Sequence, residues 1–260
     1  MEVKQFARPE TLQEAHQLLL QDSKNLILGG GLWMKKSTPS ANALIDLANL
    51  GLDKIIDHGN QLEIGAMVTL RALELSPLVQ ELQNGLLIEA VSQIMGVAFR
   101  GQATIGGSIA GRFPFSDLIT PLLVLDTTLV FYPHKEMTLE AFLGFKGRMS
   151  DILTHIIIKK STGLSFFKKV KTTALDFAIL NVAIAKIEGK CRIAVGSRPS
   201  VASLAVKAMD IINRDHKLID DAAEAAVSEL TFATTGSSSA EYRKLLAKVY
   251  VKRGLEEVSK

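Results

Sequence analysis

The chain has 260 residues, 47% of them hydrophobic, and a formal net charge of +3. Its length corresponds to roughly one and a half to two domains, with enough apolar residues for a full core. The mild charge, with few aromatic residues among the basic ones, argues against nucleic-acid binding. The single cysteine, Cys191, excludes an intrachain disulfide framework and a cysteine-ligated iron–sulfur cluster or zinc site in this chain. Because the first residues lack a signal-like apolar core and no apolar run is long enough to span a membrane, we expect a soluble, cytoplasmic protein.

The first 160 residues alternate between helical and strand patterns. Thr11 is a candidate N-cap for the first helix, and Pro121 suits the first turn of a buried helix that begins near residue 118. The expected strands are 25–28, 43–47, 62–66, 129–132 and 152–159, and the other expected helices are 11–20, 69–75 and 78–93.

The composition changes near Ser161-Thr162-Gly163, where a second pattern begins. Three strands are expected, at 166–171, 177–187 and 191–195, with a hairpin-like turn at Glu188-Gly189-Lys190. Helices are expected over 200–213, 218–229 and 239–260. The chain therefore reads as an α+β protein with a domain over 1–160, divided into subdomains of about 1–55 and 56–160, and a sheet-then-helices domain over 161–260.

Two glycine clusters give the strongest functional signal. Leu28-Gly29-Gly30-Gly31 and Thr104-Ile105-Gly106-Gly107-Ser108 each follow a stretch that is compatible with a strand. Glycine leaves backbone N–H groups free to surround an anion at positions that a side chain would block. Two such turns in one domain suit the two phosphates of a dinucleotide, and the hydroxyls of Thr104 and Ser108 add donors.

Neither cluster has the spacing of the common nucleotide motifs. Both lack the G-x-G-x-x-G dinucleotide fingerprint in a strand–turn–helix frame, and the chain has no P-loop. A lone Gly-Gly turn is more often structural than phosphate-binding. Composition and spacing leave both interpretations open.

Several ordered segments resemble one known family. They are Leu26-Ile27-Leu28-Gly29-Gly30-Gly31, Leu44-Ile45-Asp46-Leu47, Leu62-Glu63-Ile64-Gly65-Ala66, Ala103-Thr104-Ile105-Gly106-Gly107-Ser108-Ile109-Ala110, Phe115-Ser116-Asp117-Leu118, Asp176-Phe177-Ala178 and Ala240-Glu241-Tyr242-Arg243. In this order they resemble the FAD-binding (medium) subunit, or middle domain, of the molybdenum hydroxylases, which include xanthine dehydrogenase and carbon monoxide dehydrogenase. The resemblance covers essentially the whole chain.

The resemblance implies a PCMH-type FAD-binding fold, in which two α+β subdomains hold the cofactor. It also implies a C-terminal domain with a three-stranded antiparallel sheet and helices. The pyrophosphate is then expected between two segments, Leu26, Ile27, Leu28, Gly29, Gly30, Gly31, Leu32 and Trp33 on one side and Thr104, Ile105, Gly106, Gly107 and Ser108 on the other.

Four further residues match cofactor-contacting positions of the family. Ile94 is expected near the flavin, Asp117 on a ribose or ribityl hydroxyl, Leu153 on the cofactor through its backbone, and Lys168 near the flavin ring. A cation there would favour the negative charge that a reduced flavin carries near N1 and C2=O. No catalytic residue and no metal ligand is expected in this chain.

Three of these residues have a structural alternative. Asp117 is well placed to cap the helix that begins at residue 118. From the residues alone, Lys168 is better explained as a solvated strand lysine beside Lys169 and Lys171. Trp33 fits a core position as well as a contact in which its ring covers part of the adenine side of the cofactor.

The chain also departs from the family pattern. Gly31 stands where many relatives have threonine or serine, and Ser108 replaces a commoner asparagine. Thr172 and Thr173 lie where relatives often have arginine. These changes bear on cofactor affinity and flavin potential.

The resemblance implies an oxidoreductase subunit that transfers electrons. Substrate would be hydroxylated at a molybdopterin centre on a large partner subunit, and electrons would pass through 2Fe-2S clusters on a small partner subunit to FAD held here, with NAD as the expected acceptor. Two alternatives stay open: a stand-alone FAD-dependent oxidoreductase of the muramate-reductase type, and a scaffold subunit that has lost FAD.

Overall fold

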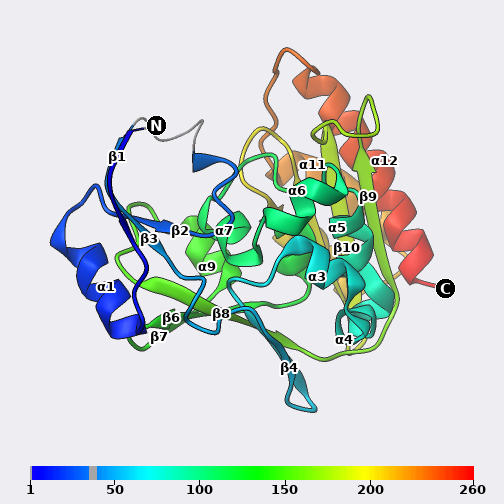
Figure 1. Cartoon of the computed structure of the whole chain (residues 1–260). Coiled ribbons are helices and arrows are strands. Elements are labelled where there is room, and N and C mark those ends of the chain that lie inside the picture. Colours follow the sequence, from blue (N-terminus) through cyan, green and yellow to red (C-terminus); the bar gives the residue numbers. More distant parts are fainter. Residues whose placement is uncertain (1, 35–39) are drawn as a thin grey trace.

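The computed structural model describes residues 2–34 and 40–260. In this described part of the chain, the strands form three sheets, each made from one continuous stretch of sequence (Figure 1). No helix among these residues has the length and apolar character needed to cross a membrane.

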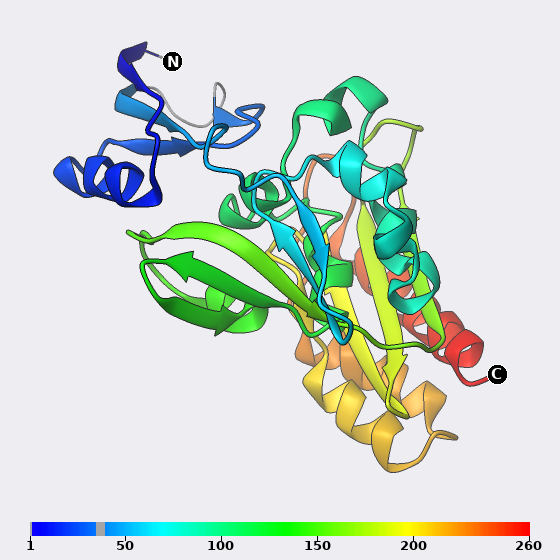
Figure 2. The ribbon, with the colours of Figure 1, turned by 60° about the horizontal axis from the view of Figure 1, so that its bottom comes forward.

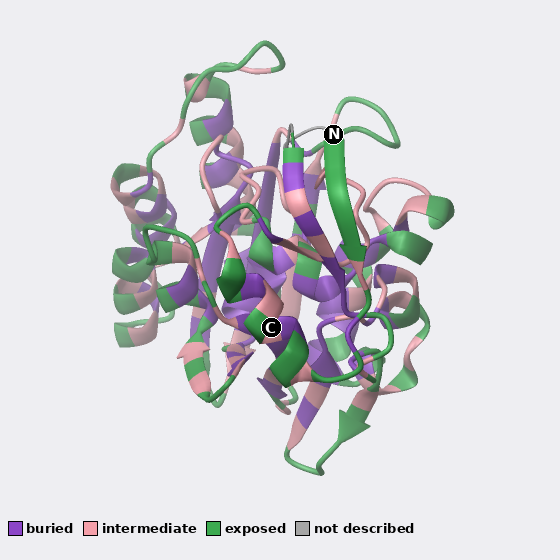
Figure 3. Cartoon of the chain, turned by 60° about the vertical axis from the view of Figure 1, so that its left-hand side comes forward, coloured by how far each residue is buried: buried purple, intermediate pink, exposed green. Residues whose placement is uncertain are grey.

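The N-terminal sheet is small and parallel. Its order is β1-β3-β2, formed by β1 (Glu2–Ala7), β3 (Ser40–Asp46) and β2 (Leu26–Leu28). Helix α1 (Leu12–Gln21) crosses between the first two strands, and the side chain of Thr11 accepts a hydrogen bond from the backbone N–H of Glu14, as its role as N-cap predicts. Strand β1, which the sequence patterns did not indicate, is the exposed edge of this sheet (Figure 3).

The second sheet is antiparallel and has five strands in the order β4-β5-β8-β6-β7. These strands are β4 (Ile55–Asp57), β5 (Gln61–Gly65), β8 (Ile152–Lys159), β6 (Thr128–Tyr132) and β7 (Lys135–Thr138). Short helices connect β5 to β6 and β7 to β8: α3 (Leu70–Leu75), α4 (Pro77–Gln80), α5 (Leu86–Ser92), α6 (Val97–Gln102), α7 (Ile105–Ala110), α8 (Ile119–Val124) and α9 (Leu139–Gly144). Helix α8 is wholly buried, as its apolar sequence predicts.

The expectation of a continuous helix over 78–93 is wrong. The chain there forms α4, a 3-10 turn η1 (Leu82–Gly85) and α5. The break lies where Gln83, Asn84 and Gly85 take positive φ values of 44°, 52° and 80°. Such backbone ends an α-helix, and asparagine and glycine are the residues that adopt it most readily.

The third sheet has four antiparallel strands, one more than expected. Its order is β12-β11-β10-β9, from β12 (Ser203–Leu204), β11 (Lys190–Gly196), β10 (Leu180–Ile187) and β9 (Ser165–Val170). The extra strand β12 pairs only two residues, inside the segment that the sequence assigned to a helix over 200–213. The helices that follow are α10 (Val206–Arg214), α11 (Ile219–Glu229) and α12 (Ala240–Val258).

The third sheet is buried on both faces. On one face of β10, Leu180, Val182 and Ile184 pack with helices α10 to α12. On the other face, Ala183 and Ala185 belong to the core of the five-stranded sheet and its helices. Figure 2 shows the consequence: the C-terminal sheet is sandwiched between its own helices and the central part of the molecule.

Candidate functional site

A cavity of about 480 Å³ lies between the N-terminal sheet, helices α6 and α7, and the ends of β8 and β9. This size is in the range of cofactor pockets. Its wall contains both glycine clusters, although they come from different parts of the chain. All of the expected site residues line it except Leu28, Ile105 and Lys168.

The first glycine cluster lies against the second and against the backbone that leads into it; a Cβ at Gly29 would lie 3.6 Å from the Cα of Gly107. A Cβ at Gly30 would lie 2.1 Å from the carbonyl oxygen of Gln102, and one at Gly29 would lie 2.8 Å from Oγ1 of Thr104. The Gln102 side chain also donates a 2.9 Å hydrogen bond to the Gly30 carbonyl. Only glycine permits this approach, so the clusters form one continuous wall.

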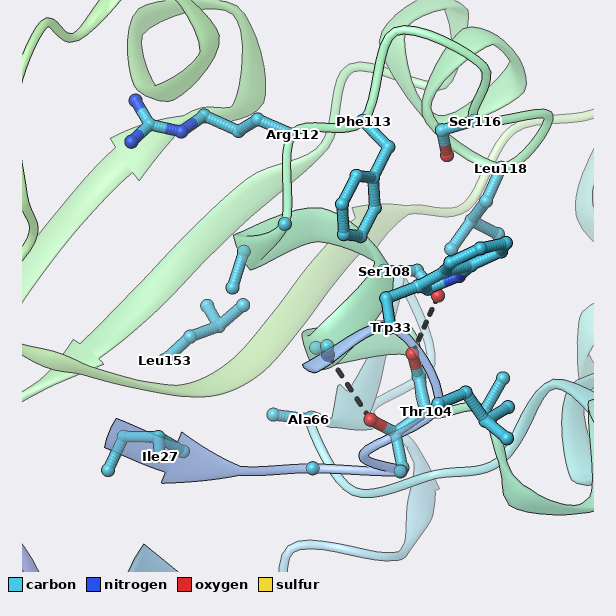
Figure 4. Close-up of a pocket in the computed structure, with 18 of the residues that line it drawn as sticks. Ile27, Trp33, Ala66, Thr104, Ser108, Arg112, Phe113, Ser116, Leu118 and Leu153 are labelled. Atoms are coloured by element: carbon cyan, nitrogen blue, oxygen red, sulfur yellow. Dashed lines mark hydrogen bonds between the residues drawn. The ribbon is translucent and has the colours of Figure 1, made fainter. Parts of the chain in front are cut away.

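The second cluster begins a helix instead of a turn after a strand, and it follows helix α6. Thr104 is the N-cap of α7, and its Oγ1 accepts a 3.2 Å hydrogen bond from the Gly107 N–H. The Ser108 hydroxyl donates to the Thr104 carbonyl at 2.8 Å, as Figure 4 shows. The Ser108 hydroxyl therefore uses its proton in a hydrogen bond within the helix. Ile105 is fully buried in the core.

A buried ion pair lies in the cavity wall. Lys169 Nζ is 2.7 Å from Oδ2 of Asp117 and donates to the Gln93 carbonyl at 3.1 Å. Asn181 donates to the other carboxylate oxygen of Asp117 at 2.7 Å. Burial raises the pKa of the Asp117 carboxyl, and the interactions with Lys169 and Asn181 oppose that rise.

Asp117 does not cap helix α8. The N-cap position is Leu118, without a side-chain cap, and the N–H of Ile119 is instead within 3.4 Å of the Ser116 hydroxyl. The carboxylate of Asp117 is therefore directed to Lys169 and Asn181, and the capping interpretation is wrong.

The lysine in the cavity wall is Lys169, not Lys168. Strand β9 buries Phe167 and Lys169 on one face and leaves Lys168 exposed on the other, where its Nζ lies 5.8 Å from the ring centroid of Tyr250. Side chains of a strand alternate between faces, so a shift of one residue reverses the assignment.

Five aromatic rings gather in the cavity wall, among them that of Phe115, two residues before Asp117. Trp33 lies 5.2–6.0 Å from the rings of Phe99, Phe113, Phe115 and Phe177, measured between centroids. Figure 4 shows Trp33 and Phe113 beside each other above the glycine wall. Trp33 is therefore a member of the cavity wall through ring contacts and not a residue of the main core.

The end of the cavity near β2 is less aromatic. Ile27 and Leu153 line it, and Arg148 donates a 2.6 Å hydrogen bond to the Asn25 carbonyl. Arg112 binds the carbonyls of Phe145 and Gly147. Both arginines thus hold the loop before β8 against the cavity.

Sequence patterns missed Lys169, Phe177 and Asn181. The adjacent Phe166-Phe167 and Lys168-Lys169 pairs fit either register of β9, so alternation alone does not choose between the lysines. Asn181 had a usable signal: it is a polar residue in an apolar strand, a position that requires a hydrogen-bonding partner when it is buried. Within residues 2–34 and 40–260, no group of three or more His, Cys, Asp or Glu side chains has the arrangement of a metal site.

Comparison with known proteins now identifies the family. A family model for the FAD binding domain in molybdopterin dehydrogenase matches residues 2–160, and one for the CO dehydrogenase flavoprotein C-terminal domain matches residues 165–258. The chain belongs to this flavoprotein family. This confirms the resemblance seen in the sequence.

Two relatives match over nearly their whole length. The uncharacterized protein YgfM of Escherichia coli K12 is 28% identical, and the match covers 96% of this chain and 94% of YgfM. The nicotine 6-hydroxylase medium subunit of Paenarthrobacter nicotinovorans is 26% identical, and the match covers 97% of this chain and 96% of the relative.

A solved structure confirms the fold. A chain of carbon monoxide dehydrogenase from Hydrogenophaga pseudoflava superposes with a TM-score of 0.87 at 25% identity, covering 98% of this chain and 96% of the other. The expected mixed α and β architecture is therefore correct, with the fourth strand of the C-terminal sheet as the difference.

Proposed function

We propose that this chain holds FAD in the cavity and is the electron-transfer medium subunit of a molybdenum hydroxylase complex. FAD would take electrons from 2Fe-2S clusters on a small partner subunit, reduced by a molybdopterin-bearing large subunit, and would deliver them to NAD. The observation that carries this proposal is the meeting of the two distant glycine clusters in one cavity wall.

The residues present fit this cofactor. The joined backbone of Gly29 to Gly31 and of Gly106 to Ser108 provides a wall without side chains, suited to the approach of a diphosphate. The end lined by Trp33 and Ile94 suits a planar aromatic ring system. The apolar end at Ile27 and Leu153 suits the adenine.

The chain's own groups have distinct roles in this proposal. FAD supplies the redox chemistry, accepting electrons singly or in pairs and donating a hydride. Lys169 holds a positive charge at the aromatic end, and Asp117 orients it. The ring cluster keeps water from that end of the cavity. No side chain needs to act as an acid or base on the hydroxylated substrate.

The test is quantification of flavin in the purified full-length chain. FAD should co-purify in near one-to-one ratio or rebind from solution, with the visible absorption of a protein-bound flavin. Failure of the folded chain to bind added FAD would overturn the proposal and support a scaffold subunit.

The partners and acceptor require a second experiment. Tagged chain should capture a molybdopterin-binding chain and a 2Fe-2S chain from its native host, and the reconstituted complex should reduce NAD⁺ when given the hydroxylase substrate. Reduction of an artificial dye but not of NAD⁺ would contradict NAD as acceptor. Flavin turnover by the isolated chain on an organic substrate would instead favour a stand-alone oxidoreductase.

A further inference from the structure

A buried polar network continues from the cavity wall into the C-terminal sheet. Asn181, fully buried on β10, donates through Nδ2 to Oδ1 of Asp117 at 2.7 Å. Thr120, fully buried on α8, donates through its hydroxyl to Oδ1 of Asn181 at 2.6 Å. Lys169 completes the network through its 2.7 Å contact with the other oxygen of Asp117. The network therefore joins residues of α8, β9 and β10.

The Asp117 carboxylate fixes which way the Asn181 amide faces. An ionised carboxylate only accepts hydrogen bonds, so the amide nitrogen must face Asp117, and the amide oxygen then accepts from the Thr120 hydroxyl. A buried acceptor without its donor costs more than the bond itself contributes, so both ends of the amide are constrained.

The sheet makes room for this arrangement at Gly196. This residue pairs with Asn181 across β10 and β11. A Cβ at Gly196 would lie 2.2 Å from Oδ1 of Asn181 and 2.3 Å from Oγ1 of Thr120. Any larger residue would displace the hydrogen bond between Thr120 and Asn181.

We propose that Asn181, held in place by its hydrogen bond from Thr120, is a positioning residue for the flavin site: it fixes the Asp117 carboxylate and thereby keeps the Lys169 ammonium in the cavity wall. Asn181 does not line the cavity, so it acts only through these neighbours. This inference rests on the proposed function, because it assigns the ammonium an effect on bound FAD.

The decisive variant is Asn181→Asp, which keeps the shape but places a second carboxyl opposite Asp117. One of the two facing carboxyls must then take up a proton or leave an extra negative charge beside the cavity. Extra negative charge disfavours reduced flavin, so the midpoint potential of bound FAD should become more negative, and increasingly so as the pH rises. The FAD dissociation constant should also rise, because the Lys169 ammonium is no longer held in its place in the cavity wall.

The matched control is Asn213→Asp. Asn213 also makes two side-chain hydrogen bonds in the C-terminal part, to the backbone of Cys191, but it has no contact with the network. This variant should leave the potential and its pH dependence as in the wild type. If Asn181→Asp does not fold, Thr120→Val is the variant to use. It removes the hydroxyl that donates to Asn181 at nearly constant shape, and it should shift the midpoint potential of bound FAD measurably, by less than a new charge would.

A second readout does not need FAD. In the cofactor-free chain, the unfolding free energy of Asn181→Asp should fall as the pH rises, because the folded state holds the shared proton more tightly than the unfolded state. Asn213→Asp, whose new carboxyl is only half-buried and still accepts from the Cys191 N–H, should show a smaller slope. Equal pH profiles and equal potentials for the two variants would overturn the inference. A different result would separate the two proposals. If neither the wild type nor any variant binds FAD, but the unfolding free energy of Asn181→Asp still falls as the pH rises, the proposed function is wrong and the network is only structural.

Discussion

Gly30 illustrates how one missing side chain decides the shape of the site. Its Cα faces the backbone of Gln102 at a distance that excludes a methyl group. The sequence identified the glycines as candidates for a phosphate-binding wall, but a Gly-Gly turn alone does not reveal what lies opposite it. The contact with Gln102 exists only because β2 and α6 are brought together by the fold.

We therefore expect Gly30→Ala to weaken FAD binding strongly and to destabilise the chain by about 1–3 kcal/mol, the usual cost of overpacking. Gly101→Ala is the control, because a Cβ at Gly101 meets no atom within 4 Å and alanine favours the helix. FAD titration and chemical unfolding of both variants check this. Equal FAD affinity for the two would contradict the role of the close backbone approach.

Lys168 and Lys169 differ only in the face of β9 that they occupy. Lys169 is 6% exposed and pairs with Asp117, which is 5% exposed, whereas Lys168 lies on the exposed face. The family resemblance pointed to Lys168, and the geometry instead places Lys169 at the cavity. An alignment cannot detect a single-residue register difference when two identical residues are adjacent.

We expect Lys169→Met to cost about 3–5 kcal/mol, because it leaves a buried carboxylate without its partner. Lys168→Met should change the unfolding free energy by no more than about 0.5 kcal/mol, as is usual for surface positions. Lys169→Met should also weaken FAD binding more than Lys168→Met does. The prediction fails if Lys168→Met has the larger effect on either quantity.

At the scale of elements, helix α6 is anchored by Arg100. This side chain is buried and donates to both carboxylate oxygens of Glu74 on α3, at 2.8 and 3.0 Å. It also donates to the carbonyls of Ile94 and Met95. Arg100 thus fixes the loop that carries Ile94 into the cavity wall, a role that no local pattern in the sequence indicates.

The Glu74–Arg100 pair predicts a pH-dependent stability. The hydrogen bond with Arg100 lowers the pKa of Glu74 below its ordinary value of 4.5. The stability from this pair is therefore fully present above pH 4.5 and is lost as the pH falls through the lowered folded pKa. Glu74→Gln should be less stable than wild type at neutral pH, with the difference shrinking in acid. Unfolding curves between neutral and acidic pH test this, and a constant difference would contradict it.

Elements with clear periodicity were predicted well. Strand β8 has the bounds expected from its β-branched residues, and α1 begins at its predicted cap. The prediction of a continuous helix over 78–93 was wrong because the leucines keep helical spacing on both sides of a break. The break is caused by the positive φ values at Gln83 and Asn84. The short strand β12 was missed because pairing with β11, not its own sequence, makes it a strand.

For the whole molecule, the arrangement of cores decides how ligand binding affects stability. The small N-terminal core around Ile45 is separate from the large core that spans residues 62–204. The cavity lies between them and is lined by both parts. A ligand in it links the N-terminal sheet to the rest of the chain.

FAD at about 100 times its dissociation constant should therefore raise the unfolding free energy by about 2.7 kcal/mol. Hydrogen exchange should slow in both glycine segments, 26–33 and 104–108, and not in the outer strand β1. Amide exchange with and without FAD, analysed by mass spectrometry, makes this measurement. Protection of only one glycine segment would show that the two do not hold the same ligand.

The sequence by itself determined the family, the α+β class, most of the strands and helices, and the two glycine clusters, because these depend on local spacing and on ordered motifs. Only the tertiary structure decided which lysine reaches the cavity, which partners Asp117 binds, and that Gln102 and Asn181 lie beside the same site. Those assignments depend on strand register and on contacts between distant segments, and such contacts leave no periodic trace along a single chain.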